Sequence, residues 1–165
     1  MFNVMLNTNV FCRPLDELTD KNVELEAKCA KEIFDFSYRE MILIFTSEIL
    51  FYEINLIEEK DKHELVFHLA KNVENRMIII DSDIETPADN LKAYIKDYAD
   101  CLHIASAALS NCSYLVTCDS ELLMKAKIIE NFLLKSNFKL HIVNPIEFVQ
   151  KVTEQYGKRH ASSTG

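Results

Sequence analysis

The feature that most constrains this chain is the stretch from Asp100 to Asp119, which reads DCLHIASAALSNCSYLVTCD. Residues 101–109 are small or apolar without strand-like alternation, and their alanines favour a helix that packs closely on a sheet. Polar residues at 111–113 break this pattern, and residues 114–117 form a short apolar run typical of a strand buried on both faces. The stretch therefore predicts a helix, a turn and a strand of an open α/β sheet, with one carboxylate at each end.

The two terminal carboxylates of this stretch allow two interpretations. Ligands of open α/β sheets bind at the carboxyl ends of the strands, which would place Asp119 at a functional edge. Asp119 is equally suited to cap the next helix, and Asp100 to complement the dipole of its own helix from the first turn. Taken singly, the two residues leave both interpretations open.

The length and the apolar content bound the architecture. The chain has 165 residues, of which 48% are hydrophobic, and this is enough for one sizeable core. Residues 157–165 are mostly small or polar and resemble a disordered tail or a vector remnant. We therefore expect one domain over residues 1–156.

The composition argues against several classes of protein. The net charge of −8 disfavours binding to nucleic acid through bulk charge, although it is compatible with a local basic strip. Both glycines, Gly157 and Gly165, lie in the tail, so no glycine-rich loop can hold a nucleotide cofactor. Five cysteines without a CxxC pair indicate neither a zinc site nor a disulfide framework and fit a reducing compartment. We find no run of membrane-spanning length and no signal-type segment, so we expect a cytoplasmic protein that binds no membrane.

The rest of the chain alternates apolar runs of strand type with segments of helical spacing. We expect the other strands at residues 2–6, 41–45, 76–80 and 139–143, and helices at 22–36, 62–75, 89–96, 120–135 and from Pro145 onward. Asp81 and Asp83 follow the third strand and are reserve site candidates. Two acids in a loop before Pro87 are, however, more often hydrated turn residues.

Glu53 is the most informative single residue of the segment that follows Thr46-Ser47-Glu48, a helix-start signal with a capping hydroxyl and a first-turn acid. At about 100° per residue the apolar side chains of this segment share one arc: Ile49, Leu50, Leu56 and Ile57. Glu53 falls near the middle of that arc. A carboxylate there must be paired, protonated or bound to a cation, unless it extends to the rim of the helix.

Four polar residues project from strand ends or from helices that begin beside them: Asn7, Glu53, Asp100 and Asp119. The predicted fold can gather them in one pocket. Three acids in one place repel each other, and the usual remedy is a divalent cation. Oxygen ligands suit Mg²⁺ or Mn²⁺, which would hold a phosphate oxygen and a water for in-line attack.

Four motifs in this order resemble the PIN-domain family of metal-dependent ribonucleases, which includes the VapC toxins. They are Leu6-Asn7-Thr8-Asn9-Val10, similar to the strand-terminal D-T-N of the family; Ser47 followed by Glu53; Asp100-Cys101-Leu102-His103-Ile104-Ala105, similar to its D-x-x-H-x-A helix; and Val116-Thr117-Cys118-Asp119. The resemblance implies a three-layer α/β/α sandwich with a mostly parallel five-stranded sheet. It also implies a site that cleaves RNA with water and one or two Mg²⁺ or Mn²⁺ ions.

The same resemblance assigns roles to the site residues. The metal ligands would be Glu53, Asp100 and Asp119, with Asn7 at the fourth catalytic position. Thr117 and Ser120 would orient water or phosphate, and His103 would contact the substrate unless it is a hydrogen-bonded structural histidine. The implied partners are an RNA substrate, an antitoxin protein and a second copy of the chain in a homodimer.

Asn7 is the one clear departure from the family pattern, which has its first Asp here. Asparagine offers a carbonyl oxygen but neither charge nor a base, so metal affinity and water activation should both fall. The chain is then either an attenuated ribonuclease, natural or engineered, or an inactive PIN-fold module that acts through a protein partner. A hydrolase with a phosphorylated aspartate ranks last, because Asn7 cannot be its nucleophile.

RNA would need a positive surface on this acidic chain. Four lysines on or beyond the helix after Asp119 are candidates to line the approach to the site: Lys125, Lys127, Lys135 and Lys139. A solvated helix face is the alternative interpretation of these lysines.

Overall fold

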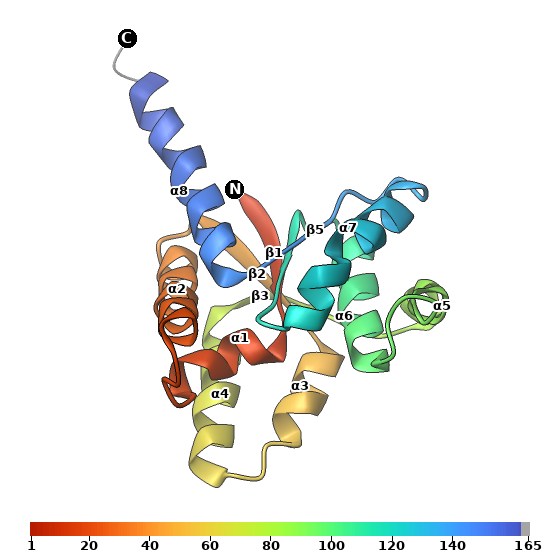
Figure 1. The fold of residues 1–165 in the computed structure, drawn as a ribbon, viewed down its shortest axis with the longest axis horizontal. Helices are drawn as coiled ribbons and strands as arrows, with labels where there is room; N and C mark the ends of the chain where they lie inside the picture. The colour runs from red at the N-terminus through yellow and green to blue at the C-terminus, as the bar shows by residue number, and fades with distance from the viewer. Residues whose placement is uncertain (163–165) are drawn as a thin grey trace.

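The structure, a computed structural model, describes the backbone of residues 1–162 and the side chains of residues 1–157. Five parallel strands form one sheet in the order β3-β2-β1-β4-β5. The strands are β1 (Phe2–Leu6), β2 (Ile42–Ser47), β3 (Glu74–Ile78), β4 (Tyr114–Val116) and β5 (His141–Val143). Helices lie on both sides of this sheet (Figure 1), which confirms the predicted α/β/α sandwich.

Two groups of helices form the outer layers. One layer contains α1 (Thr8–Cys12), the short 3₁₀ helix Arg13–Leu15, α2 (Lys21–Tyr38), α4 (Lys60–Val73) and α8 (Pro145–Ser162). The other contains α5 (Ser82–Leu91), α6 (Tyr98–Leu109) and α7 (Ser120–Leu134). Helix α3 (Glu48–Asn55) follows β2 directly and packs its buried residues into the first layer.

The central strands are apolar on both faces, as a parallel sheet between two helical layers requires. Val4 and Leu6 of β1 pack in the core under α2 and α8, whereas Met5 packs in the core under α6. The same alternation places Leu115 and Val116 of β4 in opposite cores. Each of these side chains is at most 1% exposed, so both faces of the central strands are covered by the helical layers.

The order of the strands creates a switch point between β1 and β4. From β1 the chain builds outward to β2 and β3, then returns through α5 and α6 to place β4 on the other side of β1. The backbone N–H of Asn7 donates to the carbonyl of Val116 across 2.9 Å, so the two strands stay paired to their carboxyl ends. Such a switch point is where open α/β sheets bind ligands.

The segment around Pro87 corrects one prediction. Asp81 and Asp83 do not lie in a loop before Pro87, because α5 begins at Ser82 and contains this proline. Asp81 caps the helix, and its carboxylate accepts from the backbone N–H groups of Asp83 and Ile84. This cap and the burial of one apolar face outweigh the hydrogen bond that proline removes. The helix ends at Leu91, so residues 92–96 are not helical as expected.

The start of β3 and the end of α8 also differ from their expected positions. Strand β3 begins two residues earlier than expected and is an edge strand, with Asn75 and Arg76 exposed rather than buried on both faces. Helix α8 continues to Ser162, so residues 157–162, expected to be part of a disordered tail, have helical backbone. The remainder of that expected tail, residues 163–165, lies outside the described residues.

Among the helices of the described residues, none is both long enough and apolar enough to cross a membrane.

Candidate functional site

All four predicted site residues lie at the carboxyl edge of the sheet. Asn7 follows β1 and caps α1, and Asp119 follows β4 closely and caps α7. Asp100 is in the first turn of α6, and Glu53 is in α3, directly after β2. The fold therefore brings together residues that are up to 112 positions apart in the sequence.

Asn7 contacts the neighbouring elements with both atoms of its side-chain amide. Its Oδ1 accepts from the backbone N–H of Thr8 across 2.7 Å, which assigns this atom as the oxygen. Its Nδ2 donates to Oδ1 of Asp100 across 3.1 Å and to Oγ1 of Thr117 across 3.4 Å. Asn7 is 3% exposed. It therefore presents a donor to Asp100, and the carbonyl oxygen expected to serve as a weak metal ligand is used to cap the helix.

Thr117 organises the loop between β4 and Asp119. Its Oγ1 accepts from Nδ2 of Asn7, from Nδ2 of Asn9 (3.2 Å) and from the backbone N–H of Asp119 (3.1 Å). Asn9 adds a second contact, because its Oδ1 accepts from the backbone N–H of Cys118 across 2.9 Å. Thr117 is fully buried and positions this loop, and its expected role toward water or phosphate stays a prediction.

Glu53 has two hydrogen-bonding partners, both at the same oxygen. The hydroxyl of Thr8 donates to Oε2 across 2.7 Å, and Nε2 of His103 donates to the same Oε2. Burial raises the pKa of Glu53, but the hydrogen bond and charge of His103 and the hydroxyl of Thr8 outweigh it and hold the pKa below its ordinary value. His103 is fully buried and holds Glu53 by this hydrogen bond, as the structural interpretation predicts, and its contact with substrate stays a prediction.

The apolar arc predicted around Glu53 is wrong in its members. The buried residues of α3 are Leu50, Phe51 and Ile54, and the helix ends at Asn55. Leu56 is 62% exposed because it lies beyond the last helical residue and no longer follows the helical phase. Glu53 therefore flanks the buried face. The expected capping hydroxyl, that of Ser47, makes no capping hydrogen bond and is buried without a partner among the described residues.

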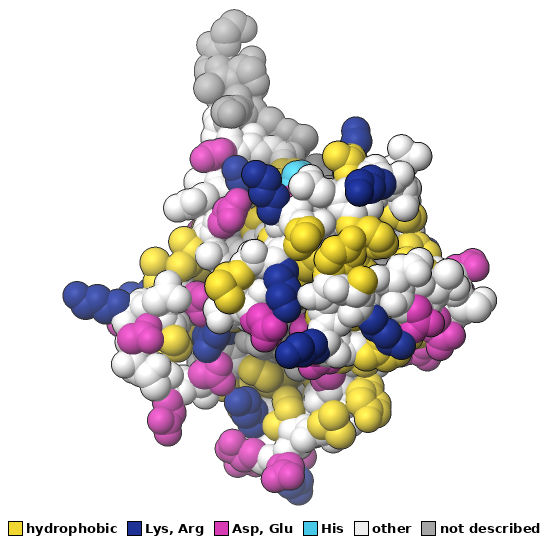
Figure 2. Space-filling view, turned by 45° about the vertical axis from the view of Figure 1, so that its right-hand side comes forward, with side chains coloured by type: hydrophobic (Ala, Val, Ile, Leu, Met, Phe, Trp, Pro, Cys, Tyr) yellow, Lys and Arg dark blue, Asp and Glu magenta, His cyan; other side chains and the backbone are white. Residues whose placement is uncertain are grey.

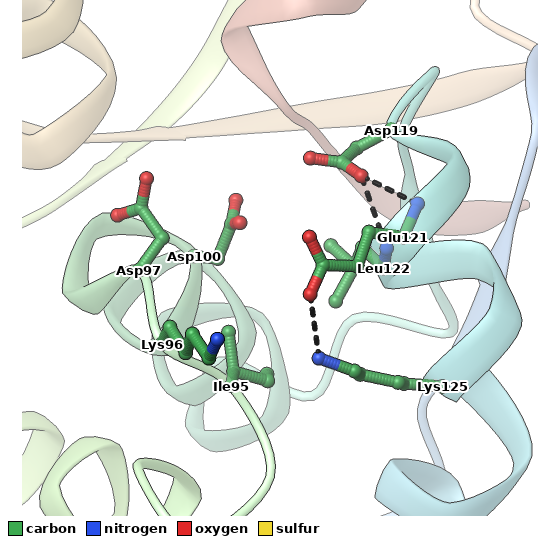
Figure 3. Close-up of a pocket in the computed structure, with 8 residues that line it drawn as sticks. All are labelled: Ile95, Lys96, Asp97, Asp100, Asp119, Glu121, Leu122 and Lys125. Atoms are coloured by element: carbon green, nitrogen blue, oxygen red, sulfur yellow. Dashed lines mark hydrogen bonds and ion pairs between the residues drawn. The ribbon is translucent and has the colours of Figure 1, made fainter.

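Asp100 and Asp119 line one pocket of about 170 Å³, which has room for several water molecules. Figure 3 shows Asp97 and Asp100 on one side of this pocket and Asp119 and Glu121 on the other. One oxygen of Asp119, Oδ1, accepts from the backbone N–H groups of Glu121 and Leu122, so the capping interpretation of Asp119 is confirmed. Asp119 therefore has both roles, because it caps α7 and also lines the pocket.

The electrostatic environment of Asp100 disfavours its charge. Burial raises the pKa of this carboxyl, and the nearby carboxylates of Asp97 and Asp119 raise it further. The hydrogen bond from Asn7 acts in the opposite direction but is outweighed. A cation in the pocket would relieve this repulsion.

Each of the three predicted acids uses one oxygen for the fold. These oxygens are Oε2 of Glu53, Oδ1 of Asp100 and Oδ1 of Asp119. In the described part of the chain, the second oxygen of each carboxylate has no hydrogen-bond partner. Three carboxylates at one sheet edge thus keep an oxygen available for a ligand.

The three acids do not form one compact metal cage. Among the described residues, no group of three or more His, Cys, Asp or Glu side chains lies close enough to hold a metal ion. The pair formed by Asp100 and Asp119 still fits Mg²⁺, which usually binds through one or two carboxylates and keeps several waters. Glu53 lies outside this pair's pocket.

The lysines at the site differ from those predicted. Lys125 lines the pocket, but Lys127 does not. Both Lys135 and Lys139 follow the far end of α7, and that end is about 20 Å along the helix from its start at the pocket. Sequence reasoning missed Lys96, Asp97 and Glu121, which are the other charged residues of the pocket lining. The only sequence signal for this group was Asp97, which suits the capping position before α6. Ser120 is exposed beside Asp119, and its role toward water or phosphate stays a prediction.

Comparison with known proteins assigns the chain to a family. A family model described as PIN domain matches residues 4–128, a range that contains all four predicted site residues, most of β1 and all of β2 to β4. Comparison with curated proteins finds no match. This family has a nuclease-type fold in general terms, and its members generally depend on divalent metal ions and bind RNA. The match covers well over half of the chain, and the chain therefore belongs to the PIN-domain family.

Proposed function

We propose that this protein is an attenuated Mg²⁺- or Mn²⁺-dependent endoribonuclease of the VapC type. One observation carries the proposal: three carboxylates at the carboxyl edge of the sheet each keep one oxygen without a partner in the described structure. Oxygen donors of this kind suit Mg²⁺ and Mn²⁺. An RNA phosphodiester is the substrate that such a site in this family would take.

Asp100 and Asp119 would hold the ion, because their carboxylates line the same pocket. A bound ion would supply an acidified water and neutralise charge on the phosphate. The chain itself fixes the two carboxylates: Asn7 orients Asp100, and the backbone N–H groups at the start of α7 orient Asp119. Glu53, held by Thr8 and His103, adds a negative charge that would orient water next to this pair.

Asn7 is the reason to expect attenuated activity. An aspartate at this position would add a third oxygen ligand and one negative charge beside Asp100, whereas the amide offers a donor. The pocket keeps its shape with Asn7, since the amide satisfies both Thr8 and Thr117. The fold is thus compatible with weak rather than absent metal-dependent activity.

The test is cleavage of a labelled single-stranded RNA in Mg²⁺ or Mn²⁺ by the wild-type chain and by Asn7→Asp. We expect the substitution to raise the cleavage rate by roughly tenfold or more, in line with the effect of other changes around metal sites. Asp119→Asn in the Asn7→Asp background should abolish cleavage, whereas Asp83→Asn, an exposed acid at the start of α5, should not. Equal cleavage by wild type and Asn7→Asp, or none by either, would refute the proposal.

A second candidate function is an inactive PIN-fold module that acts through a protein partner. The hydrogen bond from Asn7 to Asp100 favours it, because a neutral donor already satisfies one oxygen where the family pattern relies on charge. The absence of cleavage by wild type, with strong cleavage by Asn7→Asp, would support this candidate. An antitoxin protein and a homodimer, both implied by the sequence resemblance, stay predictions, as does a cytoplasmic location.

A further inference from the structure

Two lysines extend into the acidic pocket from different elements. Lys96 precedes α6, and Lys125 lies in the second turn of α7. Figure 3 shows both ammonium groups directed into the space below Asp100 and Asp119, from opposite walls. The pocket therefore combines four carboxylates, among them Asp100 and Asp119 that can bind a cation, with two ammonium groups that can bind a phosphate.

The fold gives little reason for these lysines to face the pocket. Lys125 pairs with Glu121 across 2.8 Å, but Glu121 has a side chain that is 66% exposed, and such exposed pairs contribute little to stability. Lys96 forms no ion pair with any other described residue. Both ammonium groups are therefore available to a ligand at small cost.

The rest of the surface offers a polyanion little attraction. The chain carries a net charge of −8, and the face in Figure 2 shows basic and acidic side chains interspersed without a continuous basic strip. A polyanion would be repelled by most of such a surface and must be held by a few local contacts. The pocket supplies two such contacts next to the acids that would act on a phosphodiester.

We infer that Lys96 and Lys125 bind the backbone phosphates of single-stranded RNA next to the phosphodiester held at Asp100 and Asp119. This inference rests on the proposed function for its substrate. In the free protein the carboxylate of Glu121 pairs with the ammonium group of Lys125. On binding, an RNA phosphate replaces this carboxylate.

The test measures RNA binding rather than cleavage. The intact wild-type chain, which keeps Asn7, is titrated into a labelled single-stranded RNA in Mg²⁺ at several salt concentrations, and a gel confirms that the RNA stays intact. The variants are Lys96→Ala, Lys125→Ala and Glu121→Gln. Lys127→Ala is the matched control, because Lys127 is exposed on the same helix but does not line the pocket.

We expect each of the two pocket substitutions to raise the Kd roughly two- to fivefold, as the loss of an exposed ion pair does. Each should also make the dependence of log K on log salt shallower by about 0.7, the value for one phosphate contact with a single strand. Glu121→Gln should lower the Kd, because it removes the competing carboxylate. Lys127→Ala should change both the Kd and the salt dependence less than Lys96→Ala or Lys125→Ala does.

The outcomes separate this inference from the proposed function. If Lys96→Ala and Lys125→Ala bind RNA no more weakly than Lys127→Ala, the inference is wrong, whatever the Asn7→Asp variant cleaves. If they bind more weakly while Asn7→Asp cleaves no RNA, the pocket binds RNA as inferred and the nuclease function fails. Melting temperatures equal to that of wild type confirm that the exposed lysine variants are folded.

Discussion

The side-chain nitrogen of Asn7 donates a hydrogen bond to Oδ1 of Asp100 across 3.1 Å, and this contact joins β1 to α6 at the centre of the site. The donor stands where the family pattern has an acid. A neutral donor and a carboxylate attract each other without any ion, whereas two carboxylates at this distance would repel. The contact therefore stabilises the site in the absence of metal and lowers the charge that would attract one.

We predict that Asn7→Asp destabilises the protein in EDTA and that Mn²⁺ restores much of the loss. The substitution replaces a buried hydrogen bond with like-charge repulsion, at a cost of about 1 to 3 kcal/mol. A divalent ion that binds only the folded state then adds stability by linkage. Thermal unfolding of both proteins with EDTA and with Mn²⁺ measures the two effects, and equal melting temperatures in EDTA would show that Asn7 and Asp100 are not in contact.

We predict opposite outcomes for the two glutamates of α3. In the Asn7→Asp background, Glu53→Gln should abolish RNA cleavage, because it removes the charge that Thr8 and His103 hold at the sheet edge. Glu48→Gln should leave cleavage nearly unchanged. The carboxylate of Glu48 accepts from the backbone N–H of Ile80 across 2.7 Å, and glutamine keeps an oxygen acceptor there.

The stability of the same variants provides the control. Glu48→Gln loses only a first-turn charge at the start of α3, so the free energy of unfolding should fall by about 0.3 to 1 kcal/mol. Loss of cleavage in Glu48→Gln, with cleavage retained in Glu53→Gln, would mean that Glu53 does not act at the site.

We predict that Asn9→Ala destabilises the protein and slows cleavage. Asn9 bridges Thr117 and the backbone of Cys118, and both contacts fix the loop that ends at Asp119. Losing them should lower the free energy of unfolding by about 1 to 3 kcal/mol. Chemical denaturation measures the loss, with Asn131→Ala on the exposed side of α7 as the matched control. A cost for Asn9→Ala no larger than for the control would show that this bridge is unimportant.

We predict that Cys112 makes the folded state less stable at alkaline pH. Burial raises the pKa of this thiol to about 12, above the value of about 8.5 in an unfolded chain. The stability that depends on the thiol staying neutral is therefore fully present below about pH 8.5. As the pH rises from there toward the folded pKa, the free energy of unfolding falls by about 1.36 kcal/mol per pH unit.

Cys112→Ala isolates this effect. The variant should be less stable than wild type at neutral pH, because it leaves a small cavity in the core under α6. The two free energies of unfolding should converge between about pH 8.5 and 10.5, since only the wild type loses stability by ionising this thiol. A constant difference over that range would mean that Cys112 is not buried in solution.

Local sequence patterns were sufficient for the layers of the fold. Apolar runs without alternation marked the central strands, because a strand between two helical layers is buried on both faces. The edge strand β3 was placed two residues late, since an exposed edge relaxes that pattern at Asn75 and Arg76. Helix α5 was missed because Pro87 is a strong local helix breaker. Two effects outweigh this proline: the cap by Asp81, which is local, and the burial of Ile84, which depends on tertiary packing.

The sequence by itself determined which residues reach the carboxyl edge of the sheet, because this depends only on local order along the chain. Asn7 and Asp119 follow strand ends, whereas Glu53 and Asp100 lie in helices that begin near this edge. Only the tertiary structure decided what each atom does there. The pairing of β1 with β4 sets Asn7 against Asp100 and Thr117, residues 93 and 110 positions away, and turns its amide nitrogen toward them. The direction of α7 likewise removed Lys135 and Lys139 from the site, while the turn before α6 brought Lys96 into it. Hydrophobic periodicity encodes burial within one element, whereas the direction of a hydrogen bond depends on two elements that meet only after folding.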